Sequence, residues 1–557
     1  MTGRKPETDE LILEPTTDRE GRHTFHSSFS PGGSARTKAL LAELPAVIPV
    51  IFLPGIMGTN LRSRETGEVV WRPPNASFRP TDILGIISAL LTWGFKDSRE
   101  RQELLDGSKL EVDDRGPIDV GGSGLSRETA RARGWGTVNR ASYNPIMALL
   151  QQRLNRMVSL GELDAWWREE GLRDPAAYGE ETGRAVVLTE EEVTHAAGYQ
   201  FEVWCCGYNW LNSNEESAED LLTYLNEVVF AHYREREDVS PQIDQMKVIL
   251  VTHSMGGLVA RALKLIEGGE KRILGVVHGV QPATGAPAIY HHMRCGYEGA
   301  VRFVLGRNAG QVTSVCARSA GALELVPSFD HREGDAWLFA CAEGQWDPNN
   351  TKDLPLGLPR GGDPYSEIYQ TREWYGLVPA QNEKYLDMSG NEAGPRSSAR
   401  AGFNLLVDAT SRFHKALSTQ YLTSTYVHYG ADQADDMHSW RDVVWQGNWG
   451  SLKASAGTQQ DDGRGSYRNR RFPDAPKLTK VKGGGDGTVC DWSGAAPGRA
   501  RVDASFRHGS LGSGSLNNSR KGYGHQNSYN DKGGRAQWAT LYGLVKISTA
   551  AIWNDET

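Results

Sequence analysis

The run 248–258 constrains the fold of this 557-residue chain more than any other stretch. It reads Val-Ile-Leu-Val-Thr-His-Ser-Met-Gly-Gly-Leu, so an apolar, β-branched segment passes through a serine into a helical pattern that ends at Gly268-Gly269. A continuous apolar run is typical of a strand that is buried on both faces. Because this strand turns directly into a helix, the run predicts a mostly parallel sheet flanked by helices.

The same alternation of strand and helix continues along the chain. Strand patterns cover residues 46–54, 199–206, 247–251, 273–280, 423–429 and 500–506, and helical patterns cover residues 144–160, 215–235, 258–266 and 536–551. We therefore expect the α/β fold class, with functional residues at the carboxyl ends of the strands.

The chain divides into four parts. Residues 1–45 are predicted to form a flexible arm, and residues 46–290 to form the first part of the α/β core, with an insertion at about 69–140. Residues 291–420 hold no clean strand series and many aromatic, Gly and Pro residues, which favours a cap inserted over the sheet. Residues 421–557 are expected to return to the core.

Composition excludes several classes of protein. With 39% hydrophobic residues, 23% charged residues and a mean hydropathy of −0.50, the chain fits neither a membrane bundle nor a disordered acidic protein. The strongest apolar run, 83–95, is too short to cross a bilayer, and residues 1–45 lack the apolar core of a secretory signal. Six irregularly spaced cysteines suit neither a disulfide framework nor a zinc pattern, which favours a reduced, cytosolic origin.

The net charge of −8 argues against a protein that binds nucleic acid through bulk charge. The charge is uneven, however, because residues 464–535 hold 14 Lys or Arg against 5 Asp. The simplest explanation is a set of solvated basic loops; the alternative is a surface that meets an anionic partner.

Ser254 stands where a strand passes into a helix, which is the context of the nucleophile elbow Gly-x-Ser-x-Gly. The tight turn would lift the serine Oγ clear of the sheet, and the N–H of Met255 at the helix N-terminus could stabilise an oxyanion. Thr252 replaces the first Gly of the pattern and, being larger, is expected to loosen the packing. A chance Gly-containing turn is the structural alternative.

Four segments, residues 49–61, residues 207–210, the elbow at Ser254 and residues 485–489, occur in a specific order. In that order they resemble the lipase branch of the α/β-hydrolases, closest to lecithin:cholesterol acyltransferase and GPI inositol-deacylase. The resemblance implies an α/β-hydrolase fold with large lid and cap insertions, and it leaves the cap unmatched. It also implies that the Pro-Gly loop gives the second oxyanion donor, at Met57 with Ile56 as the rival; a simple strand-ending turn is the alternative.

A serine nucleophile needs a base and a carboxylate, which follow it in the order Ser, Asp, His in this fold. Asp486, in a Gly-rich loop, resembles the lipase acid. A calcium loop is the alternative, but one carboxylate supplies too few oxygen ligands for it. The base is predicted to be His525, 39 residues later and just before the last helix, with His508 as the alternative. Other downstream acids lie in polar runs and are interpreted as solvated: Asp435, Asp436, Asp461 and Asp462.

No cofactor or metal is expected. The sequence has no Walker-A loop and no Gly-x-Gly-x-x-Gly between a strand and a helix. The pair His291-His292 has no acidic or Cys residue at metal spacing, and Cys205-Cys206 is interpreted as buried strand. His253, beside the serine, is expected to pack or position.

The substrate is predicted from apolar and basic stretches. Residues 81–96 lie where the resembling lipases carry a lid, although a buried core helix is the alternative. Together with the tryptophans of the cap and the basic excess, this stretch favours a long-chain phospholipid at an anionic surface. A triacylglycerol or small-ester hydrolase, an acyltransferase, and an inactive hydrolase-fold binding protein are the alternatives.

A second resemblance involves residues 207–214, the Thr252-His-Ser254 triplet and residues 278–285, which look similar to bacterial lipase effectors of type VI secretion. It implies a protein without a signal peptide that stays in the cytoplasm of its producer and acts in the periplasm of a neighbouring cell. It further implies a cognate immunity protein over the active-site mouth and contact with a spike protein of the secretion apparatus. No nucleic-acid partner is expected, because of the net charge.

Overall fold

The computed structural model describes most of the chain between residues 46 and 553. The described residues are 16–17, 23–24, 46–73, 93–159, 162–236, 239, 243–299, 302–388, 396–432, 439–447, 460–468, 476–481, 483–500, 502–509, 523–531 and 533–553.

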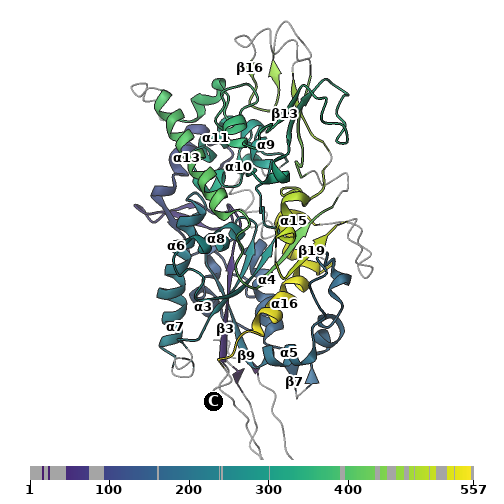
Figure 1. The fold of residues 1–557 in the computed structure, drawn as a ribbon. Coiled ribbons are helices and arrows are strands. Elements are labelled where there is room, and N and C mark those ends of the chain that lie inside the picture. Colours follow the sequence, from purple (N-terminus) through teal and green to yellow (C-terminus); the bar gives the residue numbers. More distant parts are fainter. Residues whose placement is uncertain are drawn as a thin grey trace, which may run out of the picture.

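A six-stranded parallel sheet forms the centre of the lower body in Figure 1. Its order is β19-β14-β11-β10-β3-β9, and every neighbouring pair is parallel. The strands are β3 (Ala46–Leu53), β9 (Tyr199–Cys205), β10 (Val248–His253), β11 (Ile273–Gly279), β14 (Thr425–Gly430) and β19 (Ala504–His508). The predicted parallel sheet is confirmed, and each strand lies within a few residues of its predicted position.

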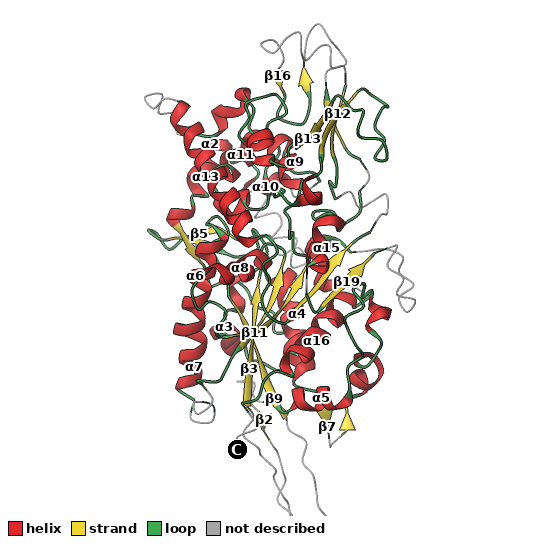
Figure 2. Cartoon of the chain, viewed as in Figure 1, coloured by secondary structure: helices red, strands yellow, loops and turns green. Residues whose placement is uncertain are grey.

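Strand β3 shows why the sheet is apolar throughout, since all eight of its residues are buried. Val47 and Ile51 pack into one core with α6 (Asn214–Tyr224), α7 (Phe230–Arg234) and α8 (Gly256–Ala262). Ile48 and Val50 point to the opposite face, into a second core with α4 (Arg140–Leu154), α5 (Glu190–Ala197) and α16 (Arg535–Ser548). Helices therefore cover both faces of the sheet (Figure 2).

Helix starts are encoded locally. Ser213 caps α6 by accepting the N–H of Glu216, whose side chain accepts the N–H of Ser213 in return. Thr189 and Glu192 form the same reciprocal pair at the start of α5. Residues 225–229 continue α6 into α7 as a wider turn, so the single helix predicted over 215–235 is one helical run in three pieces.

A cap lies above the carboxyl edge of the sheet (Figure 1). Its helices are α9 (Ala288–Cys295), α10 (Arg302–Leu305), α11 (Ala309–Cys316), α12 (Ala320–Leu323) and α13 (Arg396–Leu417). It also holds a four-stranded sheet, β13-β12-β15-β18, made of β12 (Leu338–Cys341), β13 (Leu356–Leu358), β15 (Val443–Gln446) and β18 (Lys477–Thr479).

The cap does not end where the sequence suggested. β12 pairs with β15, and β15 with β18, so segments beyond residue 420 complete a sheet that begins before it. β14 nevertheless belongs to the central sheet, which means that the chain leaves the core again after residue 430. Sequence patterns missed this second sheet because its strands have only three or four residues.

The insertion predicted over 69–140 contributes β5 (Val69–Trp71) and β6 (Leu110–Val112) to a small sheet with β4 (Leu61–Ser63), which precedes it. It also contains the helices α2 (Ser98–Leu104) and α3 (Arg127–Ala132). Most of the apolar stretch 83–95 lies outside the described residues. At its end, Trp93 is buried and Phe95 is 81% exposed.

The remaining elements are short: β1 (Thr16–Thr17), β2 (His23–Thr24), β7 (Val158–Ser159), β8 (Glu162–Leu163), β16 (Gln460–Asp461), β17 (Tyr467–Arg468) and α15 (Asp491–Arg499). Within the described ranges, no helix has both the length and the apolar character of a bilayer-spanning segment. All six cysteines are buried thiols without a disulfide.

Candidate active site

Ser254 occupies the turn between β10 and α8 with a φ of +55°, a left-handed conformation that is rare for serine. Its N–H donates to the carbonyl of Gly279 on the neighbouring strand at 2.9 Å. Gly256 is required after it, because a Cβ there would lie 2.6 Å from the carbonyl oxygen of Pro54. The local geometry is therefore the strand, tight turn and helix that the sequence predicted.

The side chains of Ser254, His525 and Asp486 form one chain of polar contacts. His525 Nε2 lies 2.8 Å from Ser254 Oγ, and His525 Nδ1 lies 2.7 Å from Asp486 Oδ2. The second carboxylate oxygen of Asp486 accepts the N–H groups of Thr488 and Val489 at 3.1 and 2.8 Å. These bonds fix the carboxylate, which is only 2% exposed.

Distant segments bring these three residues together. Asp486 follows the short link after β18, and Gly430 at the end of β14 makes room for it, since a Cβ there would lie 2.7 Å from the Cβ of Asp486. His525 opens the turn His525–Asn530 before α16, and its N–H donates to the carbonyl of Asp486 at 2.8 Å. Asp486 and His525 are thus joined through backbone as well as through side chains.

Met255 follows the serine directly in the chain, and Met57 lines the same cavity as Ser254. Met255 is the N-cap of α8, and Met57 lies in the Pro-Gly loop with a φ of +61°. Neither N–H has a hydrogen-bond partner within the described part of the chain. Gly55 permits the close approach of this loop, because a Cβ there would lie 2.9 Å from both His253 Nδ1 and Ser254 Cβ.

A cavity of about 440 Å³ opens over Ser254 and His525. Its lining includes the apolar residues Ile56, Met57, Trp71, Ile289, Val304 and Leu305. It also includes the polar residues Asn139, Ser142, Thr488, Gln526 and Asn527, with a hydrogen bond of 2.8 Å from Gln526 Nε2 to Ser142 Oγ. The cavity can therefore hold an apolar chain and a polar group at the same time.

Three aromatic residues hold the loop 54–58, and only Tyr208 falls within a segment, residues 207–210, to which the sequence had pointed. Trp71 Nε1 donates to the carbonyl of Met57 at 2.9 Å, and the Tyr208 hydroxyl donates to the carbonyl of Pro54 at 2.8 Å. The N–H of Gly55 donates to the hydroxyl oxygen of Tyr143 at 3.2 Å. Tyr143 and Tyr208 are 88 and 154 residues from their partners, so no local pattern could have revealed them.

His508, the alternative base, does not reach Ser254. It ends β19 in a buried position, where Nδ1 lies 2.8 Å from the Tyr523 hydroxyl and Nε2 lies 3.1 Å from the carbonyl of Tyr178. Burial is the main cause that lowers its pKa well below the ordinary histidine value, and the nearby His428 lowers that pKa further. His508 is therefore a neutral packing residue.

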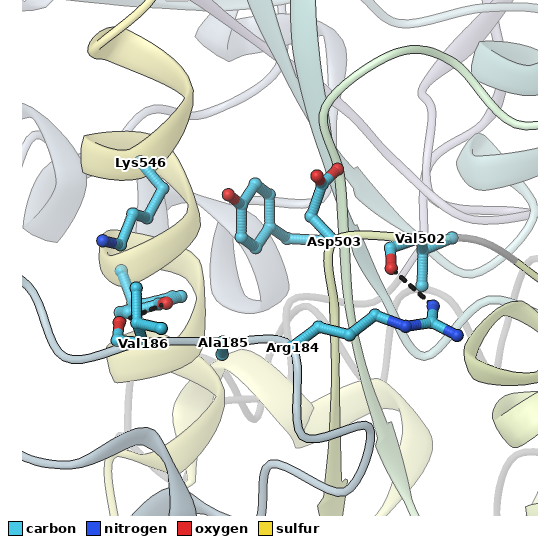
Figure 3. Close-up of a pocket in the computed structure, with 8 residues that line it drawn as sticks. Arg184, Ala185, Val186, Val502, Asp503 and Lys546 are labelled. Atoms are coloured by element: carbon cyan, nitrogen blue, oxygen red, sulfur yellow. Dashed lines mark hydrogen bonds between the residues drawn. The ribbon is translucent and has the colours of Figure 1, made fainter.

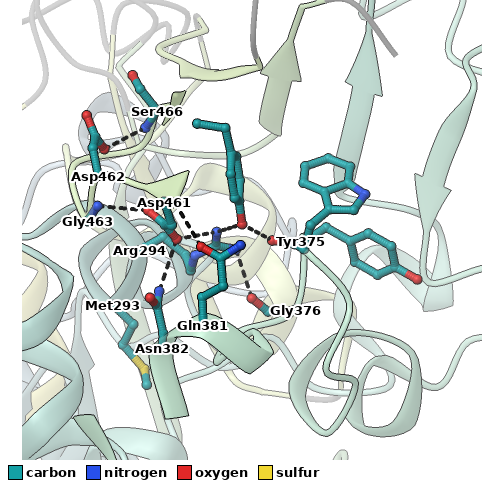
Figure 4. A network of polar contacts seen from close by, with 12 residues as sticks. Met293, Arg294, Tyr375, Gly376, Gln381, Asn382, Asp461, Asp462, Gly463 and Ser466 are labelled. Carbon is teal, nitrogen blue, oxygen red and sulfur yellow. Dashed lines mark hydrogen bonds and ion pairs between the residues drawn. The ribbon is translucent and has the colours of Figure 1, made fainter. Parts of the chain in front are cut away.

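The expectation that Asp461 is solvated is wrong. Its side chain is 1% exposed and lies 3.0 Å from Arg294 Nη2, on a guanidinium that is itself fully buried. Asn382 donates to the same carboxylate, and the Tyr467 hydroxyl lies 2.9 Å from Arg294 (Figure 4). This buried network ties α9 to the segments around β16 and β17. Asp435 and Asp436 lie outside the described residues.

No group of three or more metal-ligating side chains occurs among the residues that the structure describes. His291 stacks on Trp440 with 3.6 Å between ring centroids, and His292 stacks on Tyr297 with 3.9 Å. Burial lowers the pKa of His292 to about 4, so both rings behave as aromatic packing groups.

A second cavity of about 420 Å³ lies between the segment 184–186, residues 502–503 and α16 (Figure 3). Its charged side chains already have hydrogen-bond partners. Arg184 donates to the carbonyls of Ala500 and Val502, and Lys546 lies 2.7 Å from Glu192. Asp503 accepts the N–H of Thr425 at 2.7 Å, so of these three residues only Lys546 is in an ion pair within the described part of the chain.

The parallel sheet, the nucleophile turn and the order Ser, Asp, His define an α/β-hydrolase. No protein-family model matches the sequence, and no curated protein matches it at the sequence level. Among solved structures, the crystal structure of the Tle4–Tli4 complex contains a chain that is 50% identical to this one. The match has a TM-score of 0.86 and covers 91% of this chain and 100% of the other. The chain belongs to the Tle4 family of type VI secretion lipase effectors.

Proposed function

We propose that this protein is a serine lipase that hydrolyses carboxylic esters of membrane phospholipids and is delivered to target cells by type VI secretion. The observation that carries the proposal is the series of contacts from Asp486 through His525 to Ser254, beside a cavity that is lined by both apolar and polar residues.

Ser254 is the nucleophile of this mechanism. Its Oγ attacks the ester carbonyl carbon while His525 Nε2 takes the hydroxyl proton, and Asp486 holds the imidazole in the required tautomer and stabilises its positive charge. The tetrahedral intermediate collapses when His525 gives the proton to the leaving alcohol. Water, activated by the same histidine, then releases the fatty acid from the acyl-enzyme.

The oxyanion of the tetrahedral intermediate needs two preorganised donors. The N–H groups of Met255 and Met57 are proposed for this role, because Met255 follows Ser254 in the chain, Met57 lines the same cavity, and both N–H groups lack a partner among the described residues. Ile56 remains the rival donor in the same loop. Each donor of this kind contributes about 10²–10³ to the rate.

The cavity favours a phospholipid over a small ester. Its apolar lining residues suit a long acyl chain, and its polar lining residues, among them Ser142 and Gln526, suit a glycerophosphate leaving group. An ester hydrolase for triacylglycerols or small esters would use the same chemistry, and an acyltransferase would replace water by a second alcohol.

The family relationship supports the cellular context. Tle4 was crystallised in complex with Tli4. By analogy, this chain is proposed to bind a cognate immunity protein, to travel with a spike protein of the secretion apparatus, and to act in the periplasm of the target cell.

The deciding experiment compares wild type with Ser254→Ala on anionic phospholipid vesicles and, in parallel, on a soluble short-chain ester. Wild type is expected to release fatty acid from vesicles far faster than it cleaves the short ester, and the variant is expected to lose about 10³-fold or more on both substrates. Cleavage of the short ester alone would contradict the phospholipid substrate. Unchanged turnover by Ser254→Ala would contradict the whole mechanism.

A further inference from the structure

The peptide group between Pro54 and Gly55 is held at both of its poles. The Tyr208 hydroxyl donates to its carbonyl at 2.8 Å, and its N–H donates to the Tyr143 hydroxyl oxygen at 3.2 Å. Both tyrosines are 1% exposed, so water does not compete for these bonds. Because a peptide group is planar, two bonds at opposite poles fix its orientation. The amides of Ile56 and Met57 are the next two in the chain.

From Tyr143 the contacts continue to the catalytic histidine proposed above. The Tyr143 hydroxyl lies 3.2 Å from His253 Nδ1, and His253 Nε2 lies 3.0 Å from the backbone carbonyl of His525. A carbonyl can only accept, so Nε2 carries the proton and Nδ1 accepts from the tyrosine. The tyrosine oxygen in turn accepts from Gly55. Each donor in this chain of bonds therefore faces an acceptor.

The protonation states suit this arrangement. Burial is the main cause that lowers the pKa of His253 to about 3, and the nearby His525 adds to it, so the ring is neutral at neutral pH. Burial also raises the pKa of Tyr143 to about 12, which keeps its hydroxyl protonated.

The loop 54–58 packs closely against Tyr143 and His253 and has little room to shift. A Cβ on Gly55 would lie 2.9 Å from His253 Nδ1, and a Cβ on Gly58 would lie 2.7 Å from the Tyr143 hydroxyl. The N–H of Gly58 donates to the carbonyl of Gly55 at 3.0 Å, which closes the turn that places Met57 at positive φ.

We propose that Tyr143 and His253 are positioning residues that couple the oxyanion loop 54–58 to the backbone of His525, so that donor, nucleophile and base keep one fixed spacing. This inference rests on the proposed function, since it assigns a task to residues around that site. Catalysis requires that three segments, which are far apart in the sequence, are positioned relative to one another with a precision of a fraction of an ångström. His253 is adjacent to Ser254 in the chain, and it contacts the other two segments either directly or through Tyr143.

The test measures kcat and KM on a soluble short-chain ester, and the rate at which a fluorophosphonate labels Ser254. Tyr143→Phe removes one hydroxyl and keeps the ring. It is expected to lower kcat and the labelling rate by about 10-fold or more, with KM changed by less than about 3-fold. The matched control is Tyr542→Phe, which removes a buried hydroxyl that donates to the carbonyl of Val186 at 2.7 Å, away from the site. Equal kcat in the two variants would overturn the proposal.

Variants of His253 separate positioning from simple stability. Gln at this position can still donate to the His525 carbonyl, whereas Phe cannot, so H253Q is expected to keep more of kcat than H253F. The double variant Tyr143→Phe with His253→Phe should lose little more than His253→Phe alone, because both changes break the same chain of bonds. Losses that multiply would mean independent structural roles and would overturn the coupling.

Failure of this inference differs from failure of the proposed function. Wild type that is labelled at Ser254 but releases no fatty acid from vesicles contradicts the phospholipid substrate, and the Tyr143 comparison still decides the coupling. If Ser254→Ala abolishes labelling while Tyr143→Phe labels like Tyr542→Phe, the coupling is wrong and the serine mechanism stands. Should Tyr143→Phe fold poorly, H253Q against H253F decides the question.

Discussion

Thr252 and His278 face each other across the parallel strands β10 and β11, and Thr252 Oγ1 lies 3.0 Å from His278 Nδ1. Both residues are fully buried. The sequence suggested that threonine at the first position of the elbow would loosen the packing. Instead, the neighbouring strand supplies a polar partner, so the larger residue is accommodated by a hydrogen bond between strands.

Thr252→Val should therefore destabilise the protein without removing its chemistry. Valine has nearly the same shape but cannot bond to His278, whose Nε2 already has no partner among the described residues. Leaving a buried polar atom unpaired costs about 1–3 kcal/mol. Denaturant unfolding should show this loss, while kcat on a short-chain ester stays near wild type. A large fall in kcat at unchanged stability would contradict this role.

Asp486→Asn should lower kcat by about 10³–10⁴-fold while the fold is retained. The Asn oxygen can still accept the N–H groups of Thr488 and Val489, which turns the amide NH₂ toward His525 Nδ1. The imidazole would then carry its proton on Nε2 and could not accept the proton of Ser254. Circular dichroism checks the fold, and steady-state kinetics check the rate. Near-native turnover would show that another residue is the acid.

Gly55→Ala should lower both stability and kcat. The added methyl would lie 2.9 Å from His253 Nδ1 and from Ser254 Cβ, so the loop must move away from the serine. Overpacking of this kind costs about 1–3 kcal/mol, and a displaced oxyanion loop costs about 10²-fold in rate. Gly402→Ala is the control, because its Cβ would meet nothing within 4 Å on helix α13. That variant should keep full activity and gain about 0.5–1 kcal/mol.

Asp461→Ala should destabilise the protein far more than removal of an exposed ion pair. The change leaves the fully buried Arg294 without its carboxylate, and breaking a buried pair in this way costs about 3–5 kcal/mol. Glu298→Gln breaks the pair with Lys480, whose side chains are 57% and 45% exposed, and should cost less than about 1 kcal/mol. Chemical unfolding of the two variants measures the contrast. Equal losses would mean that the network in Figure 4 is not a source of stability.

Glu324 should make stability depend on pH. Burial raises the pKa of this carboxyl to about 8, although the backbone N–H and side chain of Asn214 donate to it. The folded protein therefore holds the proton more tightly than the unfolded chain. Its contribution is fully present below about pH 4.5 and is lost as the pH rises to about 8. Wild type measured against Glu324→Gln should lose relative stability over that range, and a flat difference would contradict the burial effect.

Much of the fold follows from local patterns. Strand β3 is apolar at every position, and β10 turns directly into α8, so hydrophobic patterning alone predicted both as strands of a mostly parallel sheet. Their pairing as neighbours came from the structure. The helices α6 and α5 each begin at a capping box, which needs only two side chains within four consecutive residues. The strands of the cap sheet were missed because three or four residues carry too little pattern to distinguish a strand from a loop.

The sequence by itself determined the order of chemical groups: a serine in a strand-to-helix turn, then an aspartate in a Gly-rich loop, then a histidine before the last helix. Only the tertiary structure decided which histidine faces Ser254, because His508 and His525 differ in their long-range contacts rather than in local pattern. The burial of Asp461 and the contacts of Tyr143 and Tyr208 were decided in the same way. The long-range partners named above lie 79 or more residues away in the chain, and contacts at such separation form only when packed elements bring the side chains together.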